Sequence, residues 1–176
     1  MAEGTFRGGG ADTVVLLCRP GFEAECAAEV EWGGSVASGA GWIGVGAEGA
    51  AAARDLRALV FARDRFIGKR FLIPDIRDRI APLVALAGEF GAVSALWLQY
   101  PDTTDGRSLS RLCERLQARF EGSLRAAGLL RSEGERRLHV MFLDGSSGFA
   151  GLSDARSGAR WRSEEHTSEL QSPCNL

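Results

Sequence analysis

Arginines recur at every fourth residue over one stretch of the sequence, at Arg107, Arg111, Arg115 and Arg119. On a helix, residues four apart lie on nearly the same face, where like charges repel by roughly 0.2–0.5 kcal/mol per pair. Asp105, Glu114 and Glu121 can relieve only part of that repulsion. Such a row is typical of a solvated helix face, but it also suits phosphate binding, because guanidinium groups bind phosphates and release condensed counterions. We call these four residues the arginine ridge.

A second basic segment lies upstream and is called the basic run: Arg63, Arg65, Lys69, Arg70, Arg77 and Arg79. Here Asp64, Asp75 and Asp78 can form local ion pairs, so the sequence favours the ridge over the run as an anion-binding surface. The candidate residues for binding the phosphates of a partner are Arg111, Arg115, Arg119, Arg107, Arg65, Lys69 and Arg70.

The other motifs that could carry chemistry have simpler interpretations. GVGAEG (44–49) matches the dinucleotide pattern GxGxxG, but the segment before it is short and interrupted by glycines, which favours a glycine-rich hairpin. His139 lies in an apolar strand pattern, and no nucleophile elbow accompanies it, so we interpret it as a structural residue. We predict no catalytic, cofactor-binding or metal-binding residue in this chain.

Composition and cysteine usage narrow the class of protein. Of the 176 residues 45% are apolar and 25% charged, which is typical of a globular protein. Residues 162–176 hold one Arg and three Glu, which accounts for the whole net charge of -2, so residues 1–161 are neutral. Cys18, Cys26 and Cys113 have no CxxC spacing and fit reduced thiols. With no secretory leader and no apolar run long enough to span a membrane, we expect a cytoplasmic protein. We also expect it to be a monomer.

Hydrophobic periodicity predicts a mixed α+β order of elements. The predicted elements are strand 13–19, helix 22–32, a hairpin over 35–49, helix 50–62, strand 65–73, helix 80–90, strand 95–100, helix 107–127 and strands 138–143 and 147–153. In the longest helix, Leu109, Leu112, Leu116 and Phe120 form the buried stripe, which leaves Arg111, Arg115 and Arg119 on outer or flanking faces. The pattern predicts two small α+β subdomains that meet near residues 74–80.

One stretch is more specific than its composition. VVLLCRPGFEAECAAEV (14–30) closely resembles the N-terminus of the bacterial ribosomal RNA large subunit methyltransferase M family. Further similar segments follow in the family's order: VFARDRFIG (60–68), DRIAPLV (78–84), residues 108–130, LHVMFLDG (138–145) and GFAGLSDARS (148–157). The resemblance covers about residues 13–161.

The resemblance implies a ferredoxin-like domain over 13–75, after a flexible leader (1–12), and a truncated THUMP-like RNA-binding domain over 76–161. Members of the family methylate the ribose 2′-hydroxyl of a cytidine in 23S rRNA with S-adenosylmethionine, in a third, Rossmann-like domain. No donor loop of the DxGxxPGG type occurs here and Lys69 is the sole lysine, so no catalytic residue carries over. Residues 162–176 read as a translated sequencing-library adapter, and we expect them to be an artefact.

Taken with the resemblance, the sequence predicts an RNA-binding fragment of a 23S rRNA methyltransferase that itself lacks activity, with rRNA as partner and neither DNA nor membrane. The alternative is a ferredoxin-like small-ligand or dimerisation domain without RNA binding. An RNA titration over a salt series separates the two, because counterion release makes only RNA binding steeply salt-dependent.

This interpretation makes a prediction about the methyl donor. Calorimetric titration of the 176-residue chain with S-adenosylmethionine should give no binding heat, because the donor loop is absent from the sequence. Micromolar binding would contradict it and would support GVGAEG as a nucleotide loop.

Overall fold

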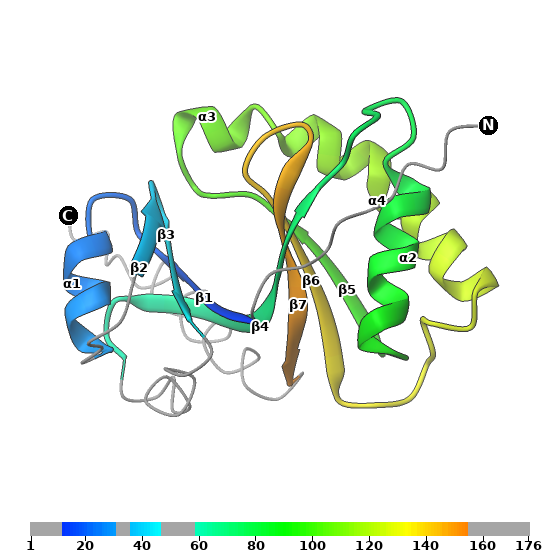
Figure 1. The fold of residues 1–176 in the computed structure, drawn as a ribbon, viewed down its shortest axis with the longest axis horizontal. Coiled ribbons are helices and arrows are strands. Elements are labelled where there is room, and N and C mark those ends of the chain that lie inside the picture. The colour runs from blue at the N-terminus through cyan, green and yellow to red at the C-terminus, as the bar shows by residue number, and fades with distance from the viewer. Residues whose placement is uncertain (1–11, 31–35, 47–58, 155–176) are drawn as a thin grey trace, which may run out of the picture.

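The computed structural model describes residues 12–30, 36–46 and 59–154, and it contains a seven-stranded sheet (Figure 1). The strands lie in the order β2-β3-β1-β4-β7-β6-β5. Neighbouring strands are antiparallel, except for β5 and β6, which are parallel. The elements are β1 (Thr13–Cys18), α1 (Glu23–Glu29), β2 (Val36–Gly39), β3 (Trp42–Gly46), β4 (Ala62–Leu72), α2 (Ile80–Phe90), β5 (Ala95–Gln99), α3 (Thr104–Arg107), α4 (Ser110–Ala126), β6 (Arg136–Phe142) and β7 (Ser147–Asp154).

β4 was predicted to lie in the first subdomain, but it pairs with strands of both. Its beginning pairs with β1, from Ala62 to Gly68, and its end pairs with β7, from Ile67 to Leu72. We call β2, β3, β1 and the beginning of β4 the first half of the sheet, and the end of β4 with β7, β6 and β5 the second half. The strands of the two predicted subdomains are therefore joined by backbone hydrogen bonds through one shared strand of 11 residues.

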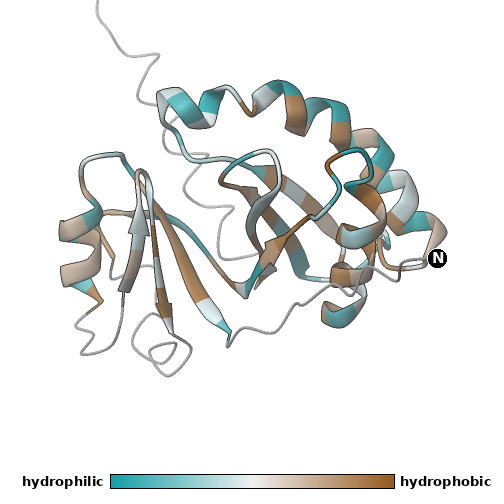
Figure 2. Ribbon diagram, turned by 45° about the horizontal axis from the view of Figure 1, so that its top comes forward, coloured by the Kyte–Doolittle hydropathy of each residue, from teal (hydrophilic) through white to brown (hydrophobic). Residues whose placement is uncertain are grey.

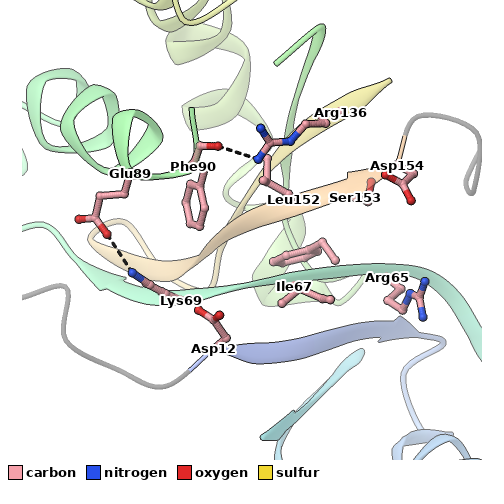
Figure 3. Close-up of a pocket in the computed structure, with 11 residues that line it drawn as sticks. Asp12, Arg65, Ile67, Lys69, Glu89, Phe90, Arg136, Leu152, Ser153 and Asp154 are labelled. Atoms are coloured by element: carbon pink, nitrogen blue, oxygen red, sulfur yellow. Dashed lines mark hydrogen bonds and ion pairs between the residues drawn. The ribbon is translucent and has the colours of Figure 1, made fainter. Parts of the chain in front are cut away.

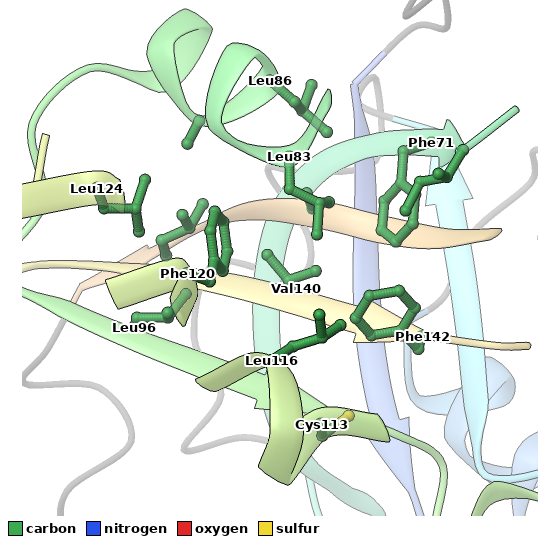
Figure 4. Packing of buried hydrophobic residues seen from close by; sticks show 14 of the residues in the cluster. Phe71, Leu83, Leu86, Leu96, Cys113, Leu116, Phe120, Leu124, Val140 and Phe142 are labelled. Atoms are coloured by element: carbon green, nitrogen blue, oxygen red, sulfur yellow. The ribbon is translucent and has the colours of Figure 1, made fainter. Parts of the chain in front are cut away.

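All three longer helices cover the same face of the sheet. Val14, which packs in the cluster beneath α1, lies directly opposite Ile67, and paired residues share a face. Phe71, four residues further along β4, shares that face because side chains alternate along a strand. Phe71 packs in the cluster beneath α2 and α4 (Figure 4).

The sheet is bent so that, on the face without helices, its two halves pack against each other. The Phe66 ring (β4) stacks on that of His139 (β6) at 5.0 Å although β7 lies between these strands. Trp42 (β3) and Phe149 (β7) are three strands apart in the order, yet their ring centroids are 5.1 Å apart. In a flat sheet that separation would be about 14 Å, because strands are about 4.8 Å apart. The two halves therefore pack face to face over a third buried cluster of Val15, Phe66, Met141 and Phe149.

Two glycines oppose each other where the pairing of β4 passes from β1 to β7. Gly68 in β4 pairs with Gly151 in β7. A Cβ on Gly68 would lie 2.1 Å from the carbonyl oxygen of Ala150, and one on Gly151 would lie 2.2 Å from that of Ile67. Since the obstructing atoms are backbone, they cannot rotate away, and a side chain at either position would force the strands apart.

A buried polar group links the two halves beside this contact. His139 is fully buried, and its Nδ1 lies 3.0 Å from Gln99 Nε2 while its Nε2 lies 2.6 Å from Ser153 Oγ. Gln99 Nε2 also donates to Asp64 Oδ2 across the halves, at 3.4 Å. The Asp64 carboxylate can only accept a hydrogen bond, so the amide nitrogen of Gln99, and not its oxygen, must face both Asp64 and His139. Nδ1 of His139 therefore accepts from Gln99, and the protonated Nε2 donates to Ser153 Oγ. Burial, and secondarily the charge of Arg137, lowers the pKa of His139 to about 3, so the ring is neutral.

The structure confirms several sequence predictions and corrects others. Helix 80–90 and the hairpin strands β2 and β3 are as predicted, and His139 is a strand residue. The predicted helix 50–62 is wrong at its end, because Ala62 is the first residue of the shared strand; residues 50–58 lie outside the described part of the chain. The predicted helix 107–127 is two helices, α3 and α4. The predicted leader and the tail 162–176 also lie outside the described residues.

The glycine contact makes a prediction about stability. Gly68→Ala should lower the free energy of unfolding by about 1–3 kcal/mol, the usual cost of inserting an atom into a packed interior. Gly122→Ala, on the exposed side of α4 with open space around it, is the control and should be neutral or more stable by up to ~1 kcal/mol. Equal stability of Gly68→Ala and the parent in urea denaturation would contradict the close approach.

Because His139 is buried in its neutral form, the free energy of unfolding should depend on pH. Because its folded pKa lies below the unfolded value, the unfolded chain binds the proton first, and stability falls as the pH drops below about 6.5. Between pH 7.5 and pH 5 this group should remove about 2 kcal/mol from the free energy of unfolding. His139→Gln should be less stable than the parent at pH 7.5, but its free energy of unfolding should lack this loss of about 2 kcal/mol between pH 7.5 and pH 5. A parent whose stability is constant between these pH values would refute the assignment.

Candidate nucleic-acid interface

Three residues of the arginine ridge, Arg111, Arg115 and Arg119, lie on α4, and the other side of that helix is buried. Leu112, Leu116, Phe120 and Leu124 point into the second half of the sheet, and Figure 2 shows α4 as alternating hydrophobic and hydrophilic bands. Arg111, Arg115 and Arg119 are exposed, as predicted. Among the described residues, no carboxylate forms an ion pair with any of these three guanidinium groups. Three cations thus face solvent along about 12 Å of helix.

The fourth residue of the ridge has a different setting. Arg107 ends α3, a short helix whose first turn is capped by Thr103, which accepts a hydrogen bond from the Gly106 amide. The Arg107 guanidinium donates from Nε and Nη2 to Asp102 Oδ1 at 3.2 and 3.0 Å. Arg107 therefore continues the ridge in sequence, but an acid neutralises part of its charge.

Most of the basic run is engaged locally. Lys69 forms an ion pair with Glu89 of α2 at 3.0 Å, which raises the pKa of the lysine. Arg77 pairs with Asp75 at 3.4 Å, and Arg79 donates to the Gly145 carbonyl at 2.7 Å. Asp75 is thus one of the predicted local partners. Of the others, Asp64 contacts the buried histidine group described above, and Asp78 accepts from the amide of Ala81 at the start of α2. Arg70 is exposed.

Arg65 and Lys69 line a pocket of about 470 Å³ that contains no residue of the ridge (Figure 3). Its floor is apolar, with Ile67, Leu152 and Phe90, and its charged lining holds three acids and three bases: Asp12, Glu89, Asp154, Arg65, Lys69 and Arg136. Arg136 donates to the Phe90 carbonyl at 2.6 Å. A balanced rim offers a polyanion no net attraction, so this pocket is a poorer RNA surface than the ridge.

One functional candidate was absent from the sequence prediction. Asp102, in the loop between β5 and α3, contacts Arg63 of the run as well as Arg107 of the ridge, with Arg63 Nη1 3.7 Å from Asp102 Oδ2. The two predicted basic surfaces therefore meet at this carboxylate. A separation of 39 residues between Arg63 and Asp102 gives no local sequence signal for this contact.

The described residues contain little that could perform covalent chemistry. Burial raises the pKa of Cys18 and Cys113 to about 11 and that of Cys26 to about 12, so these thiols are protonated and weak nucleophiles. Within the described ranges, no cluster of three or more His, Cys, Asp or Glu could hold a metal ion, and no helix is long and apolar enough to cross a membrane. Gly44 and Gly46 of the GxGxxG match lie in β3, paired with β1; residues 47–49 are outside the described part.

Two family profiles match the chain. The profile of the RlmM ferredoxin-like domain matches residues 11–66, and that of the N-terminal region of ribosomal RNA large subunit methyltransferase M matches residues 78–154. A curated relative of the latter name from Alkalilimnicola ehrlichii is 38% identical over 161 residues, which are 84% of this chain and 44% of the relative. One from Stutzerimonas stutzeri is 32% identical over 166 residues, 85% of this chain and 47% of the relative. The chain thus spans about half the length of the curated relatives it matches.

Solved structures are more distant. A possible methylase from Clostridium difficile 630 has 12% sequence identity and a TM-score of 0.48, over 80% of this chain and 41% of that one.

Proposed function

This chain belongs to the family of ribosomal RNA large subunit methyltransferase M, and from that premise we propose that it is the RNA-binding N-terminal part of a methyltransferase that acts on large-subunit rRNA. The proposed substrate of the whole enzyme is the ribose 2′-hydroxyl of a cytidine in 23S rRNA, and the proposed methyl donor is S-adenosylmethionine. The part described by the structure would hold the rRNA while another part of the enzyme performs the transfer.

The observation that carries the proposal is the set of exposed guanidinium groups on α4. Arg111, Arg115 and Arg119 stand one helical turn apart and have no ionic partner among the described residues. Like charges in this row repel one another, and a phosphodiester strand would relieve the repulsion at each position while it releases counterions. Contacts of this kind position an RNA without reading its bases.

We further propose that residues 76–161 form a THUMP-like RNA-binding domain and residues 13–75 the ferredoxin-like domain that precedes it. The boundaries of the two matching family profiles favour a division between residues 66 and 78. The shared strand β4 would hold the two domains in a fixed relation, because it is hydrogen-bonded to both. The protein would act in the cytoplasm as a monomer.

A double substitution tests the RNA-binding role of the ridge. Arg111→Gln with Arg115→Gln should preserve the fold, because both side chains are exposed, and should weaken binding of a 23S rRNA hairpin. The slope of log affinity against log salt should become shallower by about one for each lost phosphate contact, and the loss should be similar for unrelated RNA sequences.

The control for this experiment removes the same charge elsewhere. Arg77 and Arg131 are exposed and lie outside the ridge, so Arg77→Gln with Arg131→Gln should change RNA affinity little. If both double variants bind the hairpin as tightly as the parent across the salt series, the ridge is only a solvated face. Absence of salt-dependent binding in the parent would instead favour a small-ligand domain, for which the pocket of Figure 3 is the candidate site.

A further inference from the structure

Two arginines from distant parts of the sequence share one carboxylate. Arg107 donates to Asp102 Oδ1, while Arg63 approaches Oδ2. Arg63 lies at the start of β4, in the first half of the sheet. Asp102 lies in the loop after β5, and Arg107 lies in α3, which follows that loop. Two positive charges thus meet one negative charge at the place where the two halves adjoin.

A β-bulge in β4 directs the Arg63 side chain toward Asp102. In the pairing of β1 with β4, Leu17 lies opposite Asp64 but Cys18 lies opposite Ala62, so Arg63 is the extra residue of a β-bulge. The bulge reverses the alternation, so that Ala62 is buried beneath α1. A bulge redirects the side chain of its extra residue, and such irregularities are over-represented next to functional sites.

The loop that carries Asp102 is held tightly. A Cβ on Gly106 would lie 1.9 Å from the Pro101 carbonyl oxygen, and one on Gly41 would lie 3.5 Å from the Pro101 side chain, so both glycines pack against this proline. The Thr103 cap fixes the next residue. Asp102 therefore stands at a defined position, between a bulged strand and the first turn of α3.

The bonds to Asp102 are easily exchanged for bonds to another anion. The side chains of Arg63, Arg107 and Asp102 are 40%, 70% and 54% exposed, and ion pairs in such settings stabilise proteins little because water screens them. A phosphodiester approaching the pair of guanidinium groups could replace the carboxylate without desolvating a buried charge. Arg107 ends α3, and Arg111 follows four residues later in the first turn of α4, so this site adjoins the rest of the ridge along the chain.

We propose that Arg63 and Arg107, positioned by Asp102, form a phosphate-binding clamp for the same RNA strand that follows the ridge, so that the RNA crosses from one half of the sheet to the other. This inference rests on the proposed function. The clamp takes one phosphodiester, and Asp102 holds the two guanidinium groups together until the phosphate displaces it. It extends the contact surface from α4 to β4 and involves both domains in RNA binding.

Binding of a 23S rRNA hairpin to single variants of the whole chain, measured by fluorescence anisotropy over a salt series, tests the clamp. Arg63→Gln and Arg107→Gln should each weaken binding by roughly sixfold at 0.1 M salt and reduce the salt slope by about 0.7–0.9, the contribution of one phosphate contact. Arg77→Gln removes one exposed charge away from the clamp and should leave affinity unchanged. Asp102→Asn should tighten binding, because it removes a charge that competes with the phosphate while it keeps an oxygen as acceptor.

The outcomes separate the clamp from the proposed function. If Arg63→Gln and Arg107→Gln bind like Arg77→Gln while the double ridge variant binds weakly, the clamp is wrong and the ridge stands. If the ridge variant also binds like the parent, the proposed function fails as well. Weaker binding by Asp102→Asn would overturn the exchange of carboxylate for phosphate. Should Arg63→Gln fail to fold, Arg63→Lys keeps the charge and should retain the salt slope while it loses part of the affinity.

Discussion

The pairing of Gly68 with Gly151 is the contact on which the rest of this structure depends. With no side chains between them, β4 and β7 approach so closely that the sheet can fold onto itself. That fold buries Val15, Phe66, Met141 and Phe149 between the two halves and places Asp64 within hydrogen-bonding distance of Gln99. A flat sheet of the same strand order would keep these groups apart and would leave both halves without a shared core.

The same fold decides which charges meet. It brings the start of β4 to the loop after β5, and so Arg63 to Asp102 and Arg107. Charges on the helix-covered face are instead balanced around the pocket, where Lys69 pairs with Glu89. The unbalanced positive charge lies along α4, whose apolar side is buried in the core. A helix whose apolar side is fixed in the core and whose exposed side is positively charged is suited to bind the phosphate backbone of an RNA.

The parts of the fold with local signals could be predicted from the sequence. The ridge follows from a four-residue spacing beside a stripe of Leu112, Leu116 and Phe120, and helical periodicity then fixes which face is exposed. The separate helix α3 was missed, although Thr103, which caps it, is a residue type that often precedes a helix. The strand 65–73 was predicted, but its pairing with both halves of the sheet and the bulge at Arg63 were missed, because strand pairing and register depend on residues far away in the sequence. His139 was correctly interpreted as structural, but its partners Gln99 and Ser153 come from other strands and carry no local signal.

The central claim is that RNA lies along α3 and α4 and reaches β4 at Arg63. Photo-crosslinking of the chain to a 23S rRNA hairpin that carries 4-thiouridine, followed by mass spectrometry of the crosslinked peptides, tests it most directly. We expect crosslinks in peptides that contain residues 104–119 and in the peptide that contains residues 60–63. Crosslinks confined to α2 and the pocket around Lys69 and Arg136, with none in α3 or α4, would contradict it.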